Sequence, residues 1–192
     1  MPEIAIVALG LTAMAVVSLK IYHWAEAMGI KAEKYSDRAI GWKQGAEAEE
    51  GVGGLLETLP KNYFVMNDFA TKKGVIDYIV VGPKGVLTIE TRSHKGVVTQ
   101  TGEKLLRDGD PFEEDQIKQA WAKSYCVRDL LAEKGVCSLS PQPVIVFTDA
   151  DVQVKERVRR VQIIGIKDLH AFLEGLPVWM SERLSQGIID CL

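Results

Sequence analysis

The chain has 192 residues, of which 47% are hydrophobic and 26% charged, and this composition excludes a disordered tail and a fibrous repeat. Its formal net charge of −3 excludes a generally basic nucleic-acid coat, so any contact with phosphate has to be local. The 3 cysteines are odd in number and lack CxxC spacing, which argues against a disulfide framework or a structural zinc site and favours a reducing compartment.

The N-terminal segment contains an uncharged, mostly apolar run at residues 4–19. As a helix this run would span about 24 Å, somewhat less than the ~30 Å hydrocarbon core of a bilayer. Cationic residues follow the run but do not precede it, at Lys20, Lys31, Lys34, Arg38 and Lys43. The positive-inside rule therefore predicts a single-pass membrane protein whose C-terminal body lies in the cytoplasm. A cleaved signal peptide and a buried helix of the domain are the alternatives that the sequence leaves open.

The apolar run and the polar, cationic stretch after it divide the chain into four predicted segments. Residues 1–24 are predicted to form a membrane anchor that contacts the bilayer through residues 4–19, and residues 25–43 a polar helical stalk or linker. Residues 44–176 are predicted to fold as one globular domain, and residues 177–192 to form a C-terminal extension.

The globular domain is predicted to begin with a helix that ends at Pro60. Its apolar residues recur at helical spacing, at Val52, Leu55, Leu56 and Leu59. Glu49 lies on the same stripe, whereas Glu47 and Glu50 fall to its sides. Glu49 is therefore the acid directed toward the core, where it would act either on the helix dipole as a capping partner or as a ligand.

The next segment is predicted to form a β-hairpin, because the β-branched runs 75–81 and 86–92 are separated by Gly-Pro-Lys-Gly. A strand at 63–69 is predicted to precede it. If Val81 pairs with Val86, Asp77 stands directly opposite Glu90. Arg92 then lies on the same face as Glu90. The placement of Asp77 opposite Glu90 depends on this register, since a slip of one residue would turn one of the two acids to the other face of the sheet.

Two opposed carboxylates repel one another and destabilise a sheet unless a cation lies between them. Arg92 is one candidate for that cation, which would make the cluster a structural ion network. A hard divalent metal with oxygen ligands, Mg²⁺ or Mn²⁺, is the other. The sequence leaves both possibilities open.

Further along the chain, residues 112–134 are predicted to form a helix that stops at Gly135, with a buried stripe at Ala120, Ser124, Val127 and Leu131. Strands are expected at 143–148 and 161–166, and a last helix after Asp168. The basic run of the body comprises Lys155, Arg157, Arg159 and Arg160. It forms either a solvated face or a contact with a phosphate backbone.

The block GVIDYIVVGPKGVLTIETRSHKG, with GAEAEEGVGGLLETLPKNYFVMNDF before it and VIVFTDADVQV after it, resembles the nuclease-related domain (NERD) family over roughly residues 42–175. That family is similar in core to the PD-(D/E)XK nuclease superfamily. The resemblance implies an α/β fold, in which helices flank a mixed central β-sheet of the restriction-endonuclease type. It also implies a divalent metal, Mg²⁺ or Mn²⁺, beside a scissile phosphodiester of DNA or RNA.

The resemblance also places the site residues. The family's helix acid falls on Glu49, its strand acid on Asp77, and its E-x-K element on Glu90-Thr91-Arg92. The family's glutamine falls on Gln119, with Gln116 as the alternative. Asp77, Glu90 and the Thr91 carbonyl would hold the metal.

Arg92 departs from the family pattern, which has lysine there. Arginine keeps its charge at any ordinary pH, so Arg92 could stabilise charge on the phosphorane but could not act as a base. Lys118 or Lys123 could approach from the following helix, although no pattern indicates it.

We therefore expect a membrane-anchored, metal-dependent nuclease, and we expect Asp77→Ala to abolish cleavage while leaving the fold intact or steadier. The alternative is a catalytically inactive module that tethers nucleic acid or a protein to the membrane.

Overall fold

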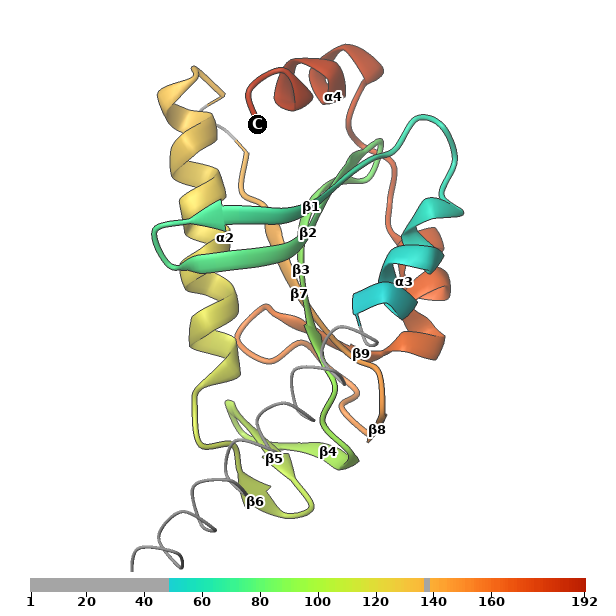
Figure 1. The fold of residues 1–192 in the computed structure, drawn as a ribbon, viewed down its shortest axis with the longest axis vertical. Helices are drawn as coiled ribbons and strands as arrows, with labels where there is room; N and C mark the ends of the chain where they lie inside the picture. Colours follow the sequence, from blue (N-terminus) through green and yellow to red (C-terminus); the bar gives the residue numbers. More distant parts are fainter. Residues whose placement is uncertain (1–48, 137–138) are drawn as a thin grey trace, which may run out of the picture. The chain divides into compact units, whose positions relative to one another are not determined.

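The computed structural model describes residues 49–136 and 139–192, and the predicted anchor and stalk lie outside them. Two mixed β-sheets and the helices around them make up this part of the chain (Figure 1). Helical residues 49–57 come first. The elements that follow are β1 (Phe64–Thr71), β2 (Gly74–Gly82), β3 (Gly85–Arg92), β4 (Gly96–Thr101), β5 (Lys104–Arg107), β6 (Asp110–Pro111), α2 (Gln116–Glu133), β7 (Gln142–Phe147), β8 (Ala150–Val152), β9 (Gln162–Gly165), the 3-10 turn Ile166–Asp168, α3 (Leu169–Gly175) and α4 (Glu182–Ile189).

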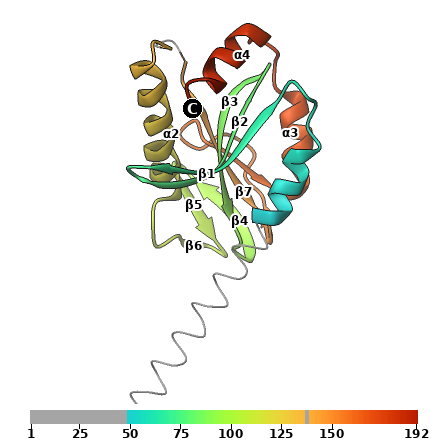
Figure 2. The same cartoon turned by 45° about the horizontal axis from the view of Figure 1, so that its top comes forward.

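The larger sheet has the strand order β1-β2-β3-β7-β9. Strands β1, β2 and β3 are antiparallel neighbours, whereas β3, β7 and β9 run parallel. Helix α2 covers one face of this sheet, and α3 with helical residues 49–57 covers the other (Figures 1 and 2). The predicted mixed central sheet flanked by helices is therefore confirmed.

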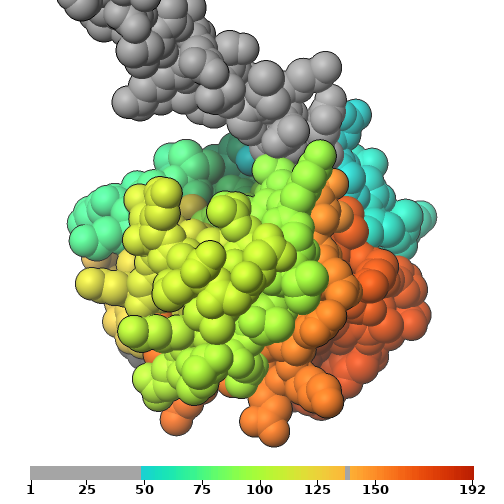
Figure 3. Space-filling model, turned by 90° about the horizontal axis from the view of Figure 1, so that it is seen from below, coloured from blue at the N-terminus to red at the C-terminus, as the bar shows by residue number. Residues whose placement is uncertain are grey.

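The smaller sheet, with the order β6-β5-β4-β8, was not predicted. Figure 3 shows its strands β4 to β6 in green to yellow-green at one end of the domain, beside the orange segment that contains β8. Val98 and Leu105 pack their buried side chains against Ile117 of α2 and Phe147 of β7, so this sheet shares a core with the main sheet.

The β2–β3 hairpin forms in the predicted register. Val81 pairs with Val86, and the Gly82–Gly85 turn closes the hairpin with Gly85 at φ 118°. That backbone conformation strains any residue with a Cβ atom, which explains a glycine at this position. The pairing ends at Tyr78 opposite Ile89, so Asp77 and Glu90 are not a cross-strand pair.

A backbone irregularity separates Asp77 from the regular part of β2. Asp68 and Asp77 are the residues between the β1–β2 pairs Asn67–Tyr78 and Phe69–Ile76, and Asp68 has a φ of 54°. Ile76 and Ile79 share one core cluster, whereas Tyr78 belongs to the cluster on the opposite face. Strict alternation along β2 therefore fails at Asp77, where the hairpin arm bends out of the sheet (Figure 1).

Helix α2 is shorter than the predicted 112–134. Asp115 is its N-cap and accepts a hydrogen bond from the backbone N–H of Lys118, while Gly135 at φ 89° follows its C-terminus as predicted. The predicted buried stripe is confirmed.

The C-terminal residues pack on the domain. Met180 and Ile188, both almost fully buried, contact the cluster that contains Ile79 of β2. In residues 49–136 and 139–192, no helix has the length and apolar character required to cross a membrane. The predicted span at 4–19 lies outside the described residues.

Candidate functional site

Glu90 on β3 is a buried carboxylate, with a residue exposure of 1%. Its Oε2 forms an ion pair with Nζ of Lys123, which reaches it from α2, and lies 3.5 Å from an Nη atom of Arg92. Its Oε1 is buried and has no hydrogen-bond partner among the described residues. Burial raises the pKa of Glu90 and the charge of Asp77 raises it further, while Lys123 and Arg92 oppose the shift.

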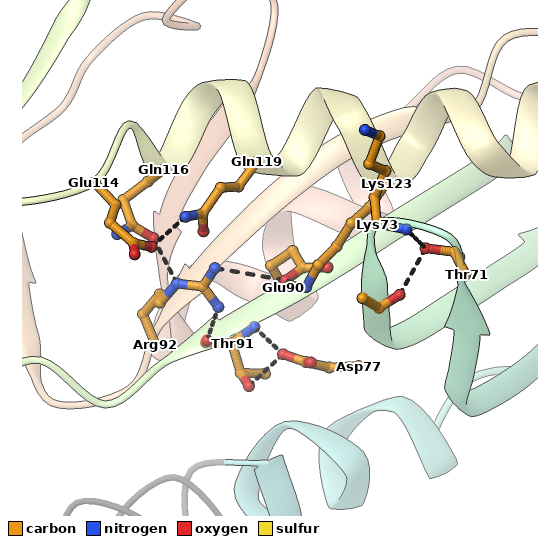
Figure 4. A network of polar contacts seen from close by, with 11 residues as sticks. Thr71, Lys73, Asp77, Glu90, Thr91, Arg92, Glu114, Gln116, Gln119 and Lys123 are labelled. Carbon is orange, nitrogen blue, oxygen red and sulfur yellow. Dashed lines mark hydrogen bonds and ion pairs between the residues drawn. The ribbon is translucent and has the colours of Figure 1, made fainter.

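Arg92 faces α2, on the same side of β3 as Glu90, as the alternation predicts (Figure 4). Its Nε donates to Oε1 of Gln116 over 2.7 Å, and its Nη1 donates to the Thr91 carbonyl over 2.6 Å. Gln119 instead donates to a carboxylate oxygen of Glu114. The structure therefore brings Gln116, the alternative assignment, into contact with the cluster, and pairs the amide of Gln119 with Glu114.

Asp77 contacts the residue next to Glu90. Its Oδ2 accepts hydrogen bonds from the backbone N–H of Thr91 over 2.6 Å and from the Thr91 hydroxyl over 2.7 Å. Asp77 and the Thr91 side chain lie on one side of β3, and Glu90 points toward α2 (Figure 4). The bend in β2 thus directs Asp77 to Thr91 rather than to the carboxylate of Glu90.

Glu49 lies near the same group of charges. Burial raises its pKa, the charges of Asp77 and Asp68 raise it further, and Lys123 opposes them. The sequence-predicted acids of the helix and of both strands are therefore close enough to interact electrostatically. Asp68 was missed by the sequence analysis; extending the pairing arithmetic to β1 would have placed it opposite Asp77.

The position of Glu49 depends on a close approach at Gly53. The hydroxyl of Tyr78 donates to the Glu49 carbonyl over 2.7 Å, and a Cβ atom at Gly53 would lie 2.8 Å from that hydroxyl oxygen. A glycine in a helix interior is otherwise worse than alanine by about 1 kcal/mol. The missing side chain at residue 53 makes room for the tyrosine hydroxyl.

Gly53→Ala is expected to lower the free energy of unfolding by about 1 kcal/mol, because the clash and the lost hydrogen bond outweigh the gain in helix propensity. In a Tyr78→Phe background the same substitution should become neutral or stabilising, since the oxygen that it would meet is gone. Urea unfolding of the four proteins measures both effects. A loss of equal size in the two backgrounds would contradict this explanation of Gly53.

The oxygen atoms predicted to bind the metal, those of Asp77, Glu90 and the Thr91 carbonyl, are of the kind that a hard cation prefers. Most of them already accept hydrogen bonds or ion pairs from other groups. Glu90 Oε1 is an unpaired buried oxygen, whereas Asp77 Oδ2 is bound by Thr91 and the Thr91 carbonyl by Arg92. Among residues 49–136 and 139–192, no three His, Cys, Asp or Glu side chains form a group that could hold a metal ion. The charge of Glu90 is balanced in this structure by Lys123 and Arg92, so the ion network considered from the sequence is present.

A cavity of about 640 Å³ opens beside Arg92. His94, Arg107, Phe112, Gln116 and Gln119 contribute to its walls, together with acidic residues of the β5–α2 connection. Burial lowers the pKa of His94, and the charges of Arg107 and Arg92 lower it further, so this imidazole is neutral at pH 7.

The predicted basic run lies apart from the Glu90 cluster. Lys155, Arg157 and Arg160 are exposed, and none of them contacts Glu90 or Arg92. Arg159 forms an ion pair with Asp115 at the start of α2.

The chain was compared with protein-family models, with curated proteins and with solved structures. The family model described as "Nuclease-related domain" matches residues 44–148, more than half of the chain. No curated protein and no solved structure matches.

Proposed function

Because the chain belongs to the nuclease-related domain family, we propose that it hydrolyses phosphodiester bonds of DNA or RNA with the help of Mg²⁺ or Mn²⁺. The observation that carries the proposal is the Glu90 carboxylate, which is buried beside two cations with Oε1 unpaired among the described residues. Buried acids with shifted pKa values are typical of catalytic sites.

In this proposal Asp77, Glu90 and the Thr91 carbonyl hold the divalent ion, and Glu49 supports it directly or through water. When bound, such an ion lowers the pKa of a coordinated water and polarises the phosphate. Arg92 stabilises the negative charge that develops on the phosphorane, and its hydrogen bond with Gln116 orients the guanidinium for this role. Gln119 lines the adjoining cavity, where it would contact the substrate.

Lys123 brings a second positive charge to Glu90, in addition to that of Arg92. The Lys123 side chain is 16% exposed and contacts the carboxylate that would hold the metal. Lys123 therefore takes the place of the E-x-K lysine near the attacking water, although it comes from α2 rather than from β3.

The full chain should cleave a DNA or RNA substrate in the presence of Mg²⁺ or Mn²⁺ and lose this activity in EDTA. Glu90→Gln should reduce cleavage at least about 100-fold, because it removes a charge that binds the ion. Glu50→Gln, at an exposed position one residue from Glu49, is the matched control and should cleave like the wild type. The melting temperature should rise with Mg²⁺ or Mn²⁺ in the wild type and not in Glu90→Gln.

A second candidate is a catalytically inactive module that binds nucleic acid or a protein. The neutralisation of Glu90 by Lys123 and Arg92 favours it, because the cluster needs no metal for charge balance. A wild-type chain that neither cleaves nor gains thermal stability with either ion would support this candidate and contradict the first.

We also propose that residues 4–19 anchor the protein in a membrane with the folded domain in the cytoplasm. The charge asymmetry around this run supports the proposal.

A further inference from the structure

Three neighbouring hollows, together called the groove below, lie around the N-terminal part of α2, starting at Arg92. The cavity beside Arg92 shares Pro111, Phe112, Glu113, Glu114 and Gln116 with a second hollow, which is also lined by Asp115 and Arg159. A third hollow begins at Arg159 and is lined by Lys118, Trp121, Ala122 and Tyr125. Arg92 of the candidate catalytic cluster therefore lies at one end of this series of hollows, and an aromatic surface of α2 lies at the other.

The aromatic surface is a preformed stack. Trp121 and Tyr125 lie one turn apart on α2, and their rings stack with centroids 5.1 Å apart and an interplanar angle of 29°. The guanidinium of Arg128 lies 4.4 Å from the centroid of Tyr125. Tyr125 is 42% exposed, with Trp121 stacked on one face of its ring and the Arg128 guanidinium on the other.

The turn beside this stack holds two arginines in a strained backbone. Arg159 and Arg160 have φ values of 47° and 67° between Val158 and Val161, which exchange two backbone hydrogen bonds. Tight turns with this backbone favour Asn-Gly. Trp121 donates its indole N–H to the Arg159 carbonyl over 2.8 Å, which fixes the turn to the stack. Strain of this kind persists where the surrounding structure enforces it, and it clusters at functional sites.

The groove carries positive charge at its aromatic end. Lys118 and Arg159 line the hollow there, Arg128 lies over the Tyr125 ring, and Arg160 follows Arg159 in the turn. Asp115 and Asp129 are ion-paired with Arg159 and Arg128. The formal net charge of the chain is −3, so this excess is local. Aromatic rings beside cations suit a chain of bases joined by phosphates, because bases stack on rings and phosphates attract cations.

We propose that this groove binds single-stranded nucleic acid, with an unpaired base packed on the exposed Trp121–Tyr125 stack in place of the Arg128 guanidinium, and phosphates on Arg159 and Arg160. The inference rests on the proposed function, because it assigns the path of the strand that flanks the cleaved bond. A duplex would not fit this role, since its bases are stacked on each other and their faces are not free.

The test measures binding of the full chain to fluorescent oligonucleotides in EDTA, where no cleavage occurs. Single-stranded DNA and single-stranded RNA of one sequence form two arms, and the matching duplex forms the third. Tyr125→Leu should weaken single-strand binding about tenfold, within the range for one stacked base, whereas Tyr125→Phe should bind like the wild type. Phe64→Leu, at an exposed position on β1, is the matched control and should have no effect.

Arg160→Gly is expected to stabilise the fold and to weaken single-strand binding, so these opposite effects distinguish a role in binding from a role in stability. The substitution should raise the melting temperature by about 2 °C, because glycine accepts a positive φ. It should also weaken single-strand binding several-fold and reduce the salt dependence of log K by about 0.7, as expected for one lost phosphate contact. Lys167→Ala, at an exposed position outside the groove, should leave the affinity unchanged.

Unchanged binding by Tyr125→Leu, or duplex binding as tight as single-strand binding, would overturn the inference. Tighter binding of RNA or of DNA would show which of the two nucleic acids the groove prefers, and either result supports the proposal. Intact single-strand binding without metal-dependent cleavage would contradict the proposed nuclease activity alone, so the two failures are distinguishable.

Discussion

Asp77→Asn is expected to reduce metal-dependent cleavage about a thousandfold and to change the melting temperature by less than about 2 °C. The loss corresponds to several kcal/mol of transition-state stabilisation by a metal that Asp77 would help to hold. Asparagine retains an oxygen that accepts the hydrogen bonds from Thr91, so the local fold is preserved. Rates of cleavage and thermal unfolding, measured on the same preparations, check both parts.

The structure changes which substitution tests this residue best. Asp77→Ala was expected from the sequence to leave the fold intact or steadier, because it removes repulsion between acids. It would also leave the buried N–H of Thr91 without its acceptor, at a cost of about 1–3 kcal/mol. A loss of activity in the alanine variant could therefore come from damage to β3, whereas the asparagine variant removes only charge.

Asp68→Asn is the matched control for Asp77→Asn. Asp68 lies opposite Asp77, is exposed, and has a backbone conformation that asparagine adopts readily. Its charge raises the pKa of Glu49, as that of Asp77 does, so both variants relieve the same electrostatic repulsion. Cleavage by Asp77→Asn at the wild-type rate, or an equal loss in Asp68→Asn, would exclude a specific role of Asp77 in binding the metal.

The sequence predicted the β2–β3 register because the information is local. The Gly-Pro-Lys-Gly turn and the β-branched runs on both sides specify the pairing of Val81 with Val86. The prediction failed at Asp77, where the irregularity involves Asp68 of a third strand in a left-handed conformation. A carboxylate at such a bend is aimed by tertiary contacts rather than by alternation.

Lys123 and the smaller sheet could not be inferred for related reasons. The Lys123–Glu90 pair joins residues 33 positions apart, and its formation depends on how α2 crosses the sheet. Strands β5, β6 and β8 have 4, 2 and 3 residues, too few to show a period of two. The sequence therefore identified Glu90 and Arg92 on one face but not the cation that pairs with Glu90 from another element.

Lys123→Met is expected to destabilise the protein by about 3 kcal/mol at neutral pH, because it leaves the buried Glu90 with Arg92 alone as a counter-charge. Burial already raises the pKa of Glu90 above its ordinary value of 4.5, so the folded state binds this proton more tightly than the unfolded state. Stability is therefore lost as the pH rises from about 4.5 through the folded-state pKa.

Without Lys123 the folded-state pKa of Glu90 rises further, and the pH window of this loss extends upward. The difference between Lys123→Met and the wild type should thus be small near pH 4.5 and largest above neutrality, in urea unfolding at several pH values. Adding Glu90→Gln to Lys123→Met should restore most of the stability, because the unpaired charge is then absent. Lys118→Met, at an exposed position on the same helix, should show no such pH dependence. A deficit of equal size at every pH, or no rescue by Glu90→Gln, would mean that Lys123 stabilises α2 by packing rather than by balancing the charge of Glu90.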